Sequence, residues 1–167
     1  MPKIVQAFFD YVCPYCCRGI LAFLDMLPDY PEVQVDWKPC EAHPRPEYAP
    51  IHSDVAAQAM LCLQDQGGDL IRFHRLVFQA YFEKRMHIDD PQVLADLAAA
   101  CGGDRKAVYK ALQARQYAAA VVENNRLAWD ELGLFAVPSY RTGNRLAGSR
   151  DGILVSKNEV AKLLSEA

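Results

Sequence analysis

The chain has 167 residues, 51% hydrophobic and 23% charged, a balance typical of one ordinary domain with a sizeable core. Its net charge is -3 and its Lys and Arg residues are scattered among acids, so we expect no nucleic-acid partner. Residues 1–10 lack the features of a secretory signal and no apolar run approaches membrane-spanning length, so we expect a cytoplasmic protein with no membrane partner.

The first 40 residues predict a β-α-β unit. Residues 3–10 are a short apolar run, typical of a strand that is buried on both faces. Apolar residues then recur at helical spacing over 15–27 and stop at Pro28, and residues 33–37 alternate between apolar and polar as in a second strand. A helix between two strands indicates a parallel crossover.

The middle of the chain predicts helices only. Apolar residues recur at helical spacing in 55–63 and in 70–81. Asp90-Pro91 is typical of an N-cap followed by the first helical residue. The alanine-rich stretch 104–132 indicates one bent helix or two.

The last 35 residues return to strands and end in a helix. Residues 135–148 indicate a β-hairpin around Gly143. Ser156 and Glu159 form the pattern of a capping box, which predicts a final helix running to Ala167. The predicted order is therefore β-α-β, a helical block, and β-β-α.

The motif Cys-Pro-Tyr-Cys lies where the first predicted strand meets the first predicted helix. Unpaired N–H groups and the dipole at a helix start stabilise a thiolate, so we expect a lowered pKa for Cys13. Cys16 lies one turn further on, where it can attack Cys13 and resolve a mixed disulfide. Pro14 suits the first helical position. The pattern predicts a redox-active dithiol.

Other interpretations of these residues stay open. The two thiols of the motif could be buried structural cysteines, or they could form a zinc site with the C-x-x-H pair Cys40 and His43. We favour the redox interpretation, with no bound metal. Cys17 is expected to be a core residue. Asp10 fits either a buried proton relay or a carboxylate that faces solvent or caps the next turn.

Two stretches resemble a known family. "FFDYVCPYC" is similar to the active-site strand and helix start of the thioredoxin superfamily, in its DsbA-like branch. "GLFAVPSY" resembles the loop in which the residue before a cis-proline faces the active-site cysteines, which makes Val137-Pro138 the expected pair. The resemblance covers essentially the whole chain. Asp10 and the tail "GSRDGI" look most like FrnE-like dithiol oxidoreductases and 2-hydroxychromene-2-carboxylate isomerases.

The resemblance implies an α/β thioredoxin fold. Residues 1–52 and 133–167 would form its N-terminal and C-terminal parts, and residues 53–132 a helical insertion between the second and third strands. It also implies a thiol-disulfide oxidoreductase or isomerase that acts on protein or glutathione, with glutathione as co-substrate and no bound cofactor. The implied site has two groups of residues: catalytic Cys13, which attacks, and Cys16, which resolves; and substrate-binding Pro14, Tyr15, Val137 and Pro138.

Departures from the family pattern define the alternatives. The dipeptide Pro14-Tyr15 matches that of glutaredoxins, which predicts a reduction potential of about -200 to -230 mV. The isomerases and kappa-class glutathione transferases usually have serine at the position of Cys13, so retention of both thiols favours redox exchange. A glutathione-dependent isomerase or transferase is the alternative, and a zinc-stabilised interaction domain is a third. The sequence leaves open whether the chain forms a homodimer.

Overall fold

Two parallel strands and an antiparallel hairpin form one four-stranded sheet in the computed structural model, which describes residues 2–166. The strand order is β2-β1-β3-β4, with β1 parallel to β2 and antiparallel to β3. The strands are β1 Lys3–Phe9, β2 Val33–Pro39, β3 Ser139–Thr142 and β4 Arg145–Gly148. Helix α1 (Pro14–Met26) and the 3-10 turn η1 (Leu27–Asp29) join β1 to β2, which confirms the predicted parallel crossover.

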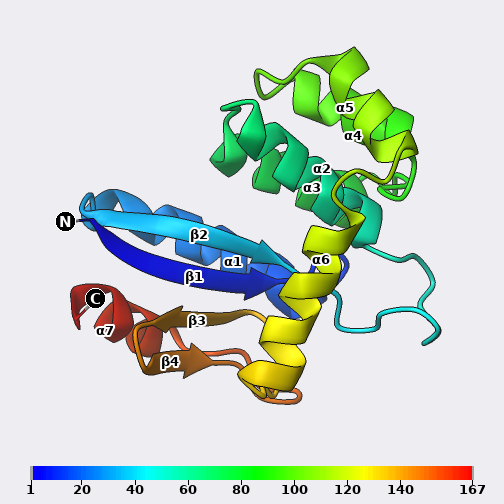
Figure 1. Cartoon of the computed structure of the whole chain (residues 1–167). Coiled ribbons are helices and arrows are strands. Elements are labelled where there is room, and N and C mark those ends of the chain that lie inside the picture. The colour runs from blue at the N-terminus through cyan, green and yellow to red at the C-terminus, as the bar shows by residue number, and fades with distance from the viewer. Residues whose placement is uncertain (1, 167) are drawn as a thin grey trace.

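Strand β1 is most deeply buried at the end that leads to the cysteines. Phe8 and Phe9 are fully buried there, whereas Ile4 near the other end is 54% exposed. Burial on both faces, as predicted, therefore holds only for the second half of the strand. In Figure 1, α1 lies behind the sheet and α6 crosses in front of the end of β1.

An all-helical block separates β2 from β3, which confirms the predicted insertion in a thioredoxin fold. Three of its helices have an aspartate N-cap whose side chain accepts a hydrogen bond from a backbone N–H group. These residues are Asp69, Asp90 and Asp104. Figure 1 shows α2 to α5 gathered at one end of the molecule, with α6 running back toward the sheet. The helices are α2 Asp54–Asp65, α3 Leu70–Phe82, α4 Pro91–Ala99, α5 Arg105–Gln113, α6 Ala118–Asn125 and the π-helix η2 Arg126–Glu131.

The alanine-rich stretch 104–132 forms two helical rods, one of the two predicted outcomes. The break falls between α5 and α6, where Arg115 adopts a left-handed backbone with φ of 53°. The second rod changes from α to π geometry at Arg126 without interruption. A π-helix shifts side chains around the helix axis, and the Trp129 side chain in this segment lines the same cavity as Cys13.

The C-terminal elements match the predicted hairpin and capped helix. The turn at Gly143 joins β3 to β4. Ser156 Oγ accepts from the N–H of Glu159 at 3.2 Å, and the Glu159 carboxylate accepts from the N–H of Ser156 at 3.1 Å. Helix α7 spans Lys157–Glu166, and the predicted helix end at Ala167, like Met1, lies outside the described residues.

A buried polar pair connects the sheet to the helical block. The hydroxyl of Tyr11, just after β1, lies 2.9 Å from Nδ1 of His74 in α3. Both residues are buried against Phe9, Trp37 and Phe78. Burial lowers the pKa of His74 to about 3, so the imidazole is neutral at physiological pH. None of the helices in residues 2–166 has the length and apolarity needed to cross a bilayer.

Candidate active site

Cys13 is the N-cap residue of α1, with an extended backbone at φ -86° and ψ 122°. Its Sγ accepts a hydrogen bond from the backbone N–H of Cys16 at 3.4 Å, and Pro14 takes the first helical position. The sulfur thus occupies the place that serine or aspartate takes at many helix starts. Because the helix dipole is positive at this end, it favours the anionic form of the sulfur.

Cys16 lies one turn further along α1 and is fully buried, whereas Cys13 is half-buried. The backbone N–H of Asp10 donates to Cys16 Sγ at 3.4 Å. A hydrogen bond from the Cys16 thiol lowers the pKa of Cys13 to about 7, although partial burial opposes this shift. Burial, together with the neighbouring Cys13, raises the pKa of Cys16 well above its ordinary value. At neutral pH one sulfur ionises readily and the other stays a thiol.

The loop before β3 passes beside the reactive sulfur. The Val137–Pro138 peptide bond is cis, as the resemblance implied. The carbonyl oxygen of Val137 lies 3.8 Å from Cys13 Sγ. Ser149 Oγ, directly after β4, donates to the carbonyl oxygen of Pro138 at 2.6 Å and holds the loop in place. The arrangement leaves the backbone of Val137 next to the thiol.

Gly19 allows α1 to approach this loop closely. A Cβ atom at position 19 would lie 2.6 Å from Pro138 Cγ and 3.0 Å from Leu154 Cδ1. The proline ring has no rotamer that moves it aside, so a larger residue would displace the loop or the helix. This glycine therefore sets the spacing between the cysteines and the cis-proline loop, a role that no sequence pattern indicated.

Both carboxylate oxygens of Asp10 accept backbone hydrogen bonds. Oδ1 accepts from the N–H of Val12 at 2.9 Å, and Oδ2 accepts from the N–H of Ala42 at 2.8 Å. Asp10 is 2% exposed, and burial raises its pKa although these hydrogen bonds oppose the shift. Asp10 therefore caps the turn before the cysteines and ties it to the segment after β2. The expectation that its carboxylate faces solvent is wrong.

The residues of the zinc interpretation do not come together. Cys40 is buried and donates its S–H to the carbonyl oxygen of Phe9 at 3.5 Å, whereas His43 is exposed beside Glu47. Within residues 2–166, no three His, Cys, Asp or Glu side chains are grouped so that they could hold a metal ion.

Cys17 packs against the hydrophobic core, so the expectation of a core position is met only in part. It is only partly buried and lines a shallow groove with Leu76 and Phe82. The reason is helical geometry: Cys16 faces the sheet, so the next residue along α1 points sideways toward α3.

A cavity of about 480 Å³ opens beside Cys13. Of the predicted site residues, Cys13, Pro14, Tyr15 and Val137 line it, whereas Cys16 and Pro138 are buried and do not. The other lining residues were not predicted as site residues, although the sequence had singled out Asp10 and His43 for other roles; they are Asp10, Val12, Ala42, His43, Trp129, Leu134, Phe135, Ala136, Arg150, Asp151 and Gly152.

The cavity combines an apolar rim with a few charges. Phe135 is 81% exposed at its edge, and Tyr15 is half-buried with the Arg18 guanidinium 5.2 Å from its ring centre. Arg150 and Asp151 place opposite charges at the same opening. Apolar surface with a few convergent polar groups is the usual composition of a ligand site.

Comparisons with known proteins show the family by a sequence model and the fold by solved structures. Residues 4–157 match the model described as DSBA-like thioredoxin domain. Cytosolic disulfide reductase DsbM from Pseudomonas aeruginosa, solved with GSH, superposes with a TM-score of 0.76 at 16% identity and covers 98% of each chain. DsbA from Chlamydia trachomatis superposes with a TM-score of 0.72 at 19% identity, over 99% of this chain and 86% of that one. Uncharacterized protein YwbO of Bacillus subtilis is 24% identical, over 84% of this chain and 86% of its own.

Proposed function

The chain belongs to the DSBA-like thioredoxin domain family, and on this basis we propose that it catalyses thiol-disulfide exchange with the Cys13–Cys16 pair. The observation that carries the proposal is the contrast between the two sulfurs. Cys13 is accessible at a helix start with a pKa of about 7, and Cys16 is buried one turn behind it with a raised pKa. This contrast is what a nucleophile and a resolving thiol require.

In the reducing direction the Cys13 thiolate attacks one sulfur of the substrate disulfide. A mixed disulfide forms, and the other substrate sulfur leaves as a thiolate that takes up a proton. Cys16 then loses its proton and attacks Cys13, which releases the second substrate thiol and leaves a Cys13–Cys16 disulfide. Two electrons pass from the dithiol to the substrate, and the oxidising direction is the exact reverse.

The substrate chain would bind along the cis-proline loop. The backbone of Val137 lies beside Cys13 Sγ, where an extended segment can pair with it as an added strand. The cis peptide bond to Pro138 sets the course of this loop, and Pro14 and Tyr15 line the same cavity as Val137. The exposed ring of Phe135 provides apolar contact at the rim.

We also propose glutathione as a co-substrate. A cavity of about 480 Å³ lies within the size range of small-molecule sites, and Arg150 and Asp151 offer partners for the carboxylate and ammonium groups of a small peptide. The presence of GSH in the DsbM structure supports this choice, and the cytosolic origin of that protein supports a cytoplasmic location. The Pro14-Tyr15 dipeptide supports a potential of about -200 to -230 mV.

Insulin reduction by the wild type and by Cys13→Ser tests the proposal. Wild type coupled to glutathione should reduce insulin, and the variant should not, because a serine hydroxyl does not ionise near neutral pH. Titration of the Cys13–Cys16 couple in glutathione redox buffers gives the potential. Full activity of Cys13→Ser on a glutathione-requiring isomerisation, with no insulin reduction by wild type, would replace this function with the isomerase or transferase alternative.

A further inference from the structure

A second, larger hollow adjoins the cavity at Cys13. Its volume is about 660 Å³, and it lies between the segment after β2, the start of α2, and the rod formed by α6 and η2. Ala42 and Trp129 line both hollows, so the two hollows are neighbours on the molecule. We call this hollow the acidic groove and define it by Glu41, Asp54, Gln58, Glu123, Trp129 and Asp130.

Buried hydrogen-bond acceptors form part of the groove wall. Gln58 is 2% exposed, and no donor in residues 2–166 lies within hydrogen-bond distance of its Oε1 atom. Glu41 is 7% exposed, and its carboxylate receives one hydrogen bond, from Asn125 Nδ2 at 3.2 Å. The Oδ1 atom of Asp54 has no donor within hydrogen-bond distance among the described residues, but the Arg45 guanidinium lies 3.6 Å from it. Such acceptors are costly to bury and fit a ligand that brings several N–H donors.

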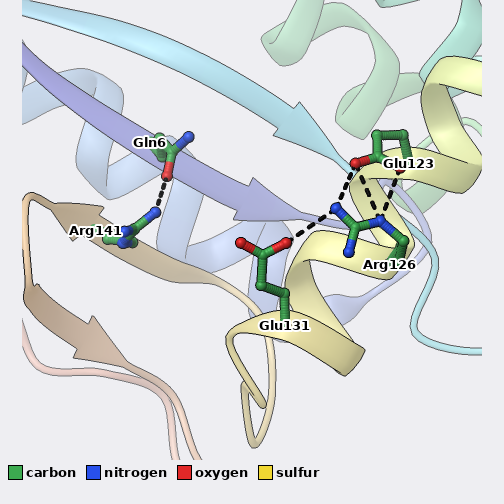
Figure 2. Close-up of polar contacts among 5 residues, drawn as sticks. All are labelled: Gln6, Glu123, Arg126, Glu131 and Arg141. Atoms are coloured by element: carbon green, nitrogen blue, oxygen red, sulfur yellow. Dashed lines mark hydrogen bonds and ion pairs between the residues drawn. The ribbon is translucent and has the colours of Figure 1, made fainter.

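The charges of the groove favour a cation. Five carboxylates and three arginines line it. Arg126 is already held by Glu123 at 2.7 Å and by Glu131 at 2.9 Å, as Figure 2 shows. Arg45 lies 3.6 Å from Asp54, and Arg115 is exposed to solvent at the break between α5 and α6. The negative charge of Glu41 therefore has no arginine partner within 4.0 Å among residues 2–166.

The remaining walls suit a long side chain rather than a metal ion. Ala118, Val121 and Trp129 line the groove with apolar surface, against which the methylene stem of a lysine or arginine can pack. Burial raises the pKa of Glu41, and the nearby Asp54 carboxylate adds to that shift, so a bound cation would relieve repulsion as well.

We propose that the acidic groove binds a lysine or arginine side chain of a polypeptide substrate whose cysteine reacts at Cys13. This inference rests on the proposed function and adds a selection rule to it. The substrate would lie across both hollows, with its cysteine at Cys13 and its basic residue on Glu41, Asp54 and Gln58. Glutathione has no lysine or arginine side chain and would therefore bind only at the first cavity.

The test uses short peptides in which one cysteine is held as a mixed disulfide with thionitrobenzoate. The reduced, full-length protein attacks the peptide sulfur, and the chromophore leaves as a coloured thiolate. A single lysine is moved through each position on both sides of the cysteine and compared with norleucine, which has a similar stem and no charge. At one or two adjacent positions lysine should react about tenfold faster than norleucine, since hydrogen bonds to charged groups are worth this much.

Variants locate the effect. In Glu41→Gln and in Gln58→Leu the ratio of the lysine rate to the norleucine rate should fall toward one. Asp89→Asn, an exposed site outside both hollows, removes the same charge as Glu41→Gln and should keep the ratio. Circular dichroism and thermal melting confirm that each variant folds, and Gln58→Leu keeps the test valid if Glu41→Gln does not fold.

The outcomes distinguish failure of the groove subsite from failure of the proposed thiol-disulfide exchange. Equal rates for lysine and norleucine at every position would overturn the groove subsite while leaving thiol-disulfide exchange intact. Absence of chromophore release from every peptide, and from oxidised glutathione, would overturn the function itself. Equal peptide rates together with a change in tryptophan fluorescence on adding n-butylguanidinium would assign the groove to a free organic cation and overturn its role in peptide selection.

Discussion

The starts of α1 and α2 each line one of the two neighbouring hollows, but they differ in how far their polar side chains are hydrogen-bonded. At the start of α1, Cys13 accepts a helix N–H and both oxygens of Asp10 accept backbone N–H groups. At the start of α2, Ser53 makes no side-chain cap bond and Gln58 Oε1 lacks a donor in the described chain, while Asp54 Oδ1 has only the Arg45 guanidinium, 3.6 Å away. The paired groups hold a reactive atom in a fixed geometry, whereas the unpaired groups leave acceptors for a ligand.

The largest expected effect is at the start of α1. Cys16→Ser should lower insulin turnover by about a thousandfold or more, because the mixed disulfide on Cys13 loses its resolving thiol. Non-reducing mass spectrometry should show the protein covalently joined to substrate. Cys17→Ser is the matched control on the next residue of the helix and should turn over normally. A Cys16→Ser protein that turns over insulin would show that Cys17 or an external thiol resolves the intermediate.

A tighter test of the same geometry is Gly19→Ala. The added Cβ meets the ring of Pro138, so we expect the free energy of unfolding to fall by about 1–3 kcal/mol. Insulin reduction should slow as well, because the loop moves away from Cys13. Urea unfolding measures the first effect, and Cys17→Ala serves as a control in the same helix. An unchanged stability would mean that α1 and the loop separate without cost.

The pH dependence follows from the two cysteine environments. Alkylation of Cys13 by iodoacetamide should rise with pH through a midpoint of about 7. Because this pKa is lowered by folding, the thiolate stabilises the reduced fold at high pH, and that contribution is lost as pH falls through about 7. The charge of Asp10 raises the pKa of Cys13, so Asp10→Asn should move the midpoint down. A midpoint that moves up would show that Asp10 acts on Cys13 mainly through the turn it caps.

The smallest expected effect is at the start of α2, where a substitution should stabilise the fold rather than destabilise it. Gln58→Leu removes a buried amide whose oxygen lacks a donor, so the free energy of unfolding should increase by about 1 kcal/mol. Thermal and urea unfolding in the absence of substrate measure it. Gln66→Leu, where the side-chain amide oxygen accepts from the N–H of Asp104 at 2.9 Å, is the contrasting control and should destabilise. A loss of stability in both variants would show that the Gln58 amide stabilises the fold and is not an unpaired group.

Local sequence patterns predicted the parts of the fold that depend on neighbours in the chain. The apolar spacing in 15–27, the caps at Asp90 and Ser156, and the turn at Gly143 all depend on residues within one helical turn or one hairpin. The order of these elements, with the resemblance of the cysteine motif, was enough to predict the fold and the meeting of the two segments that carry Cys13 and Val137.

Features that depend on distant contacts were missed. The π-helix that orients Trp129 has no periodicity of its own within an alanine-rich run. Gly19 is an ordinary helix residue until the cis-proline loop packs against it. Phe135 and Arg150 become cavity residues only because β3 and β4 bring their loops to the cysteines. Cys17 stays partly exposed at the edge of the core because Cys16 takes the inward position.

The Tyr11–His74 hydrogen bond connects the helical block to the cysteine motif in a way that does not depend on mild changes of pH. Tyr11 stands two residues before Cys13, so α3 of the helical block is hydrogen-bonded to the segment that leads into the cysteine motif. Because the pKa of His74 is about 3, its ring stays neutral in mildly acidic solution and keeps its place in this hydrogen bond. Mild acidification therefore leaves the contact between the helical block and the cysteine motif intact.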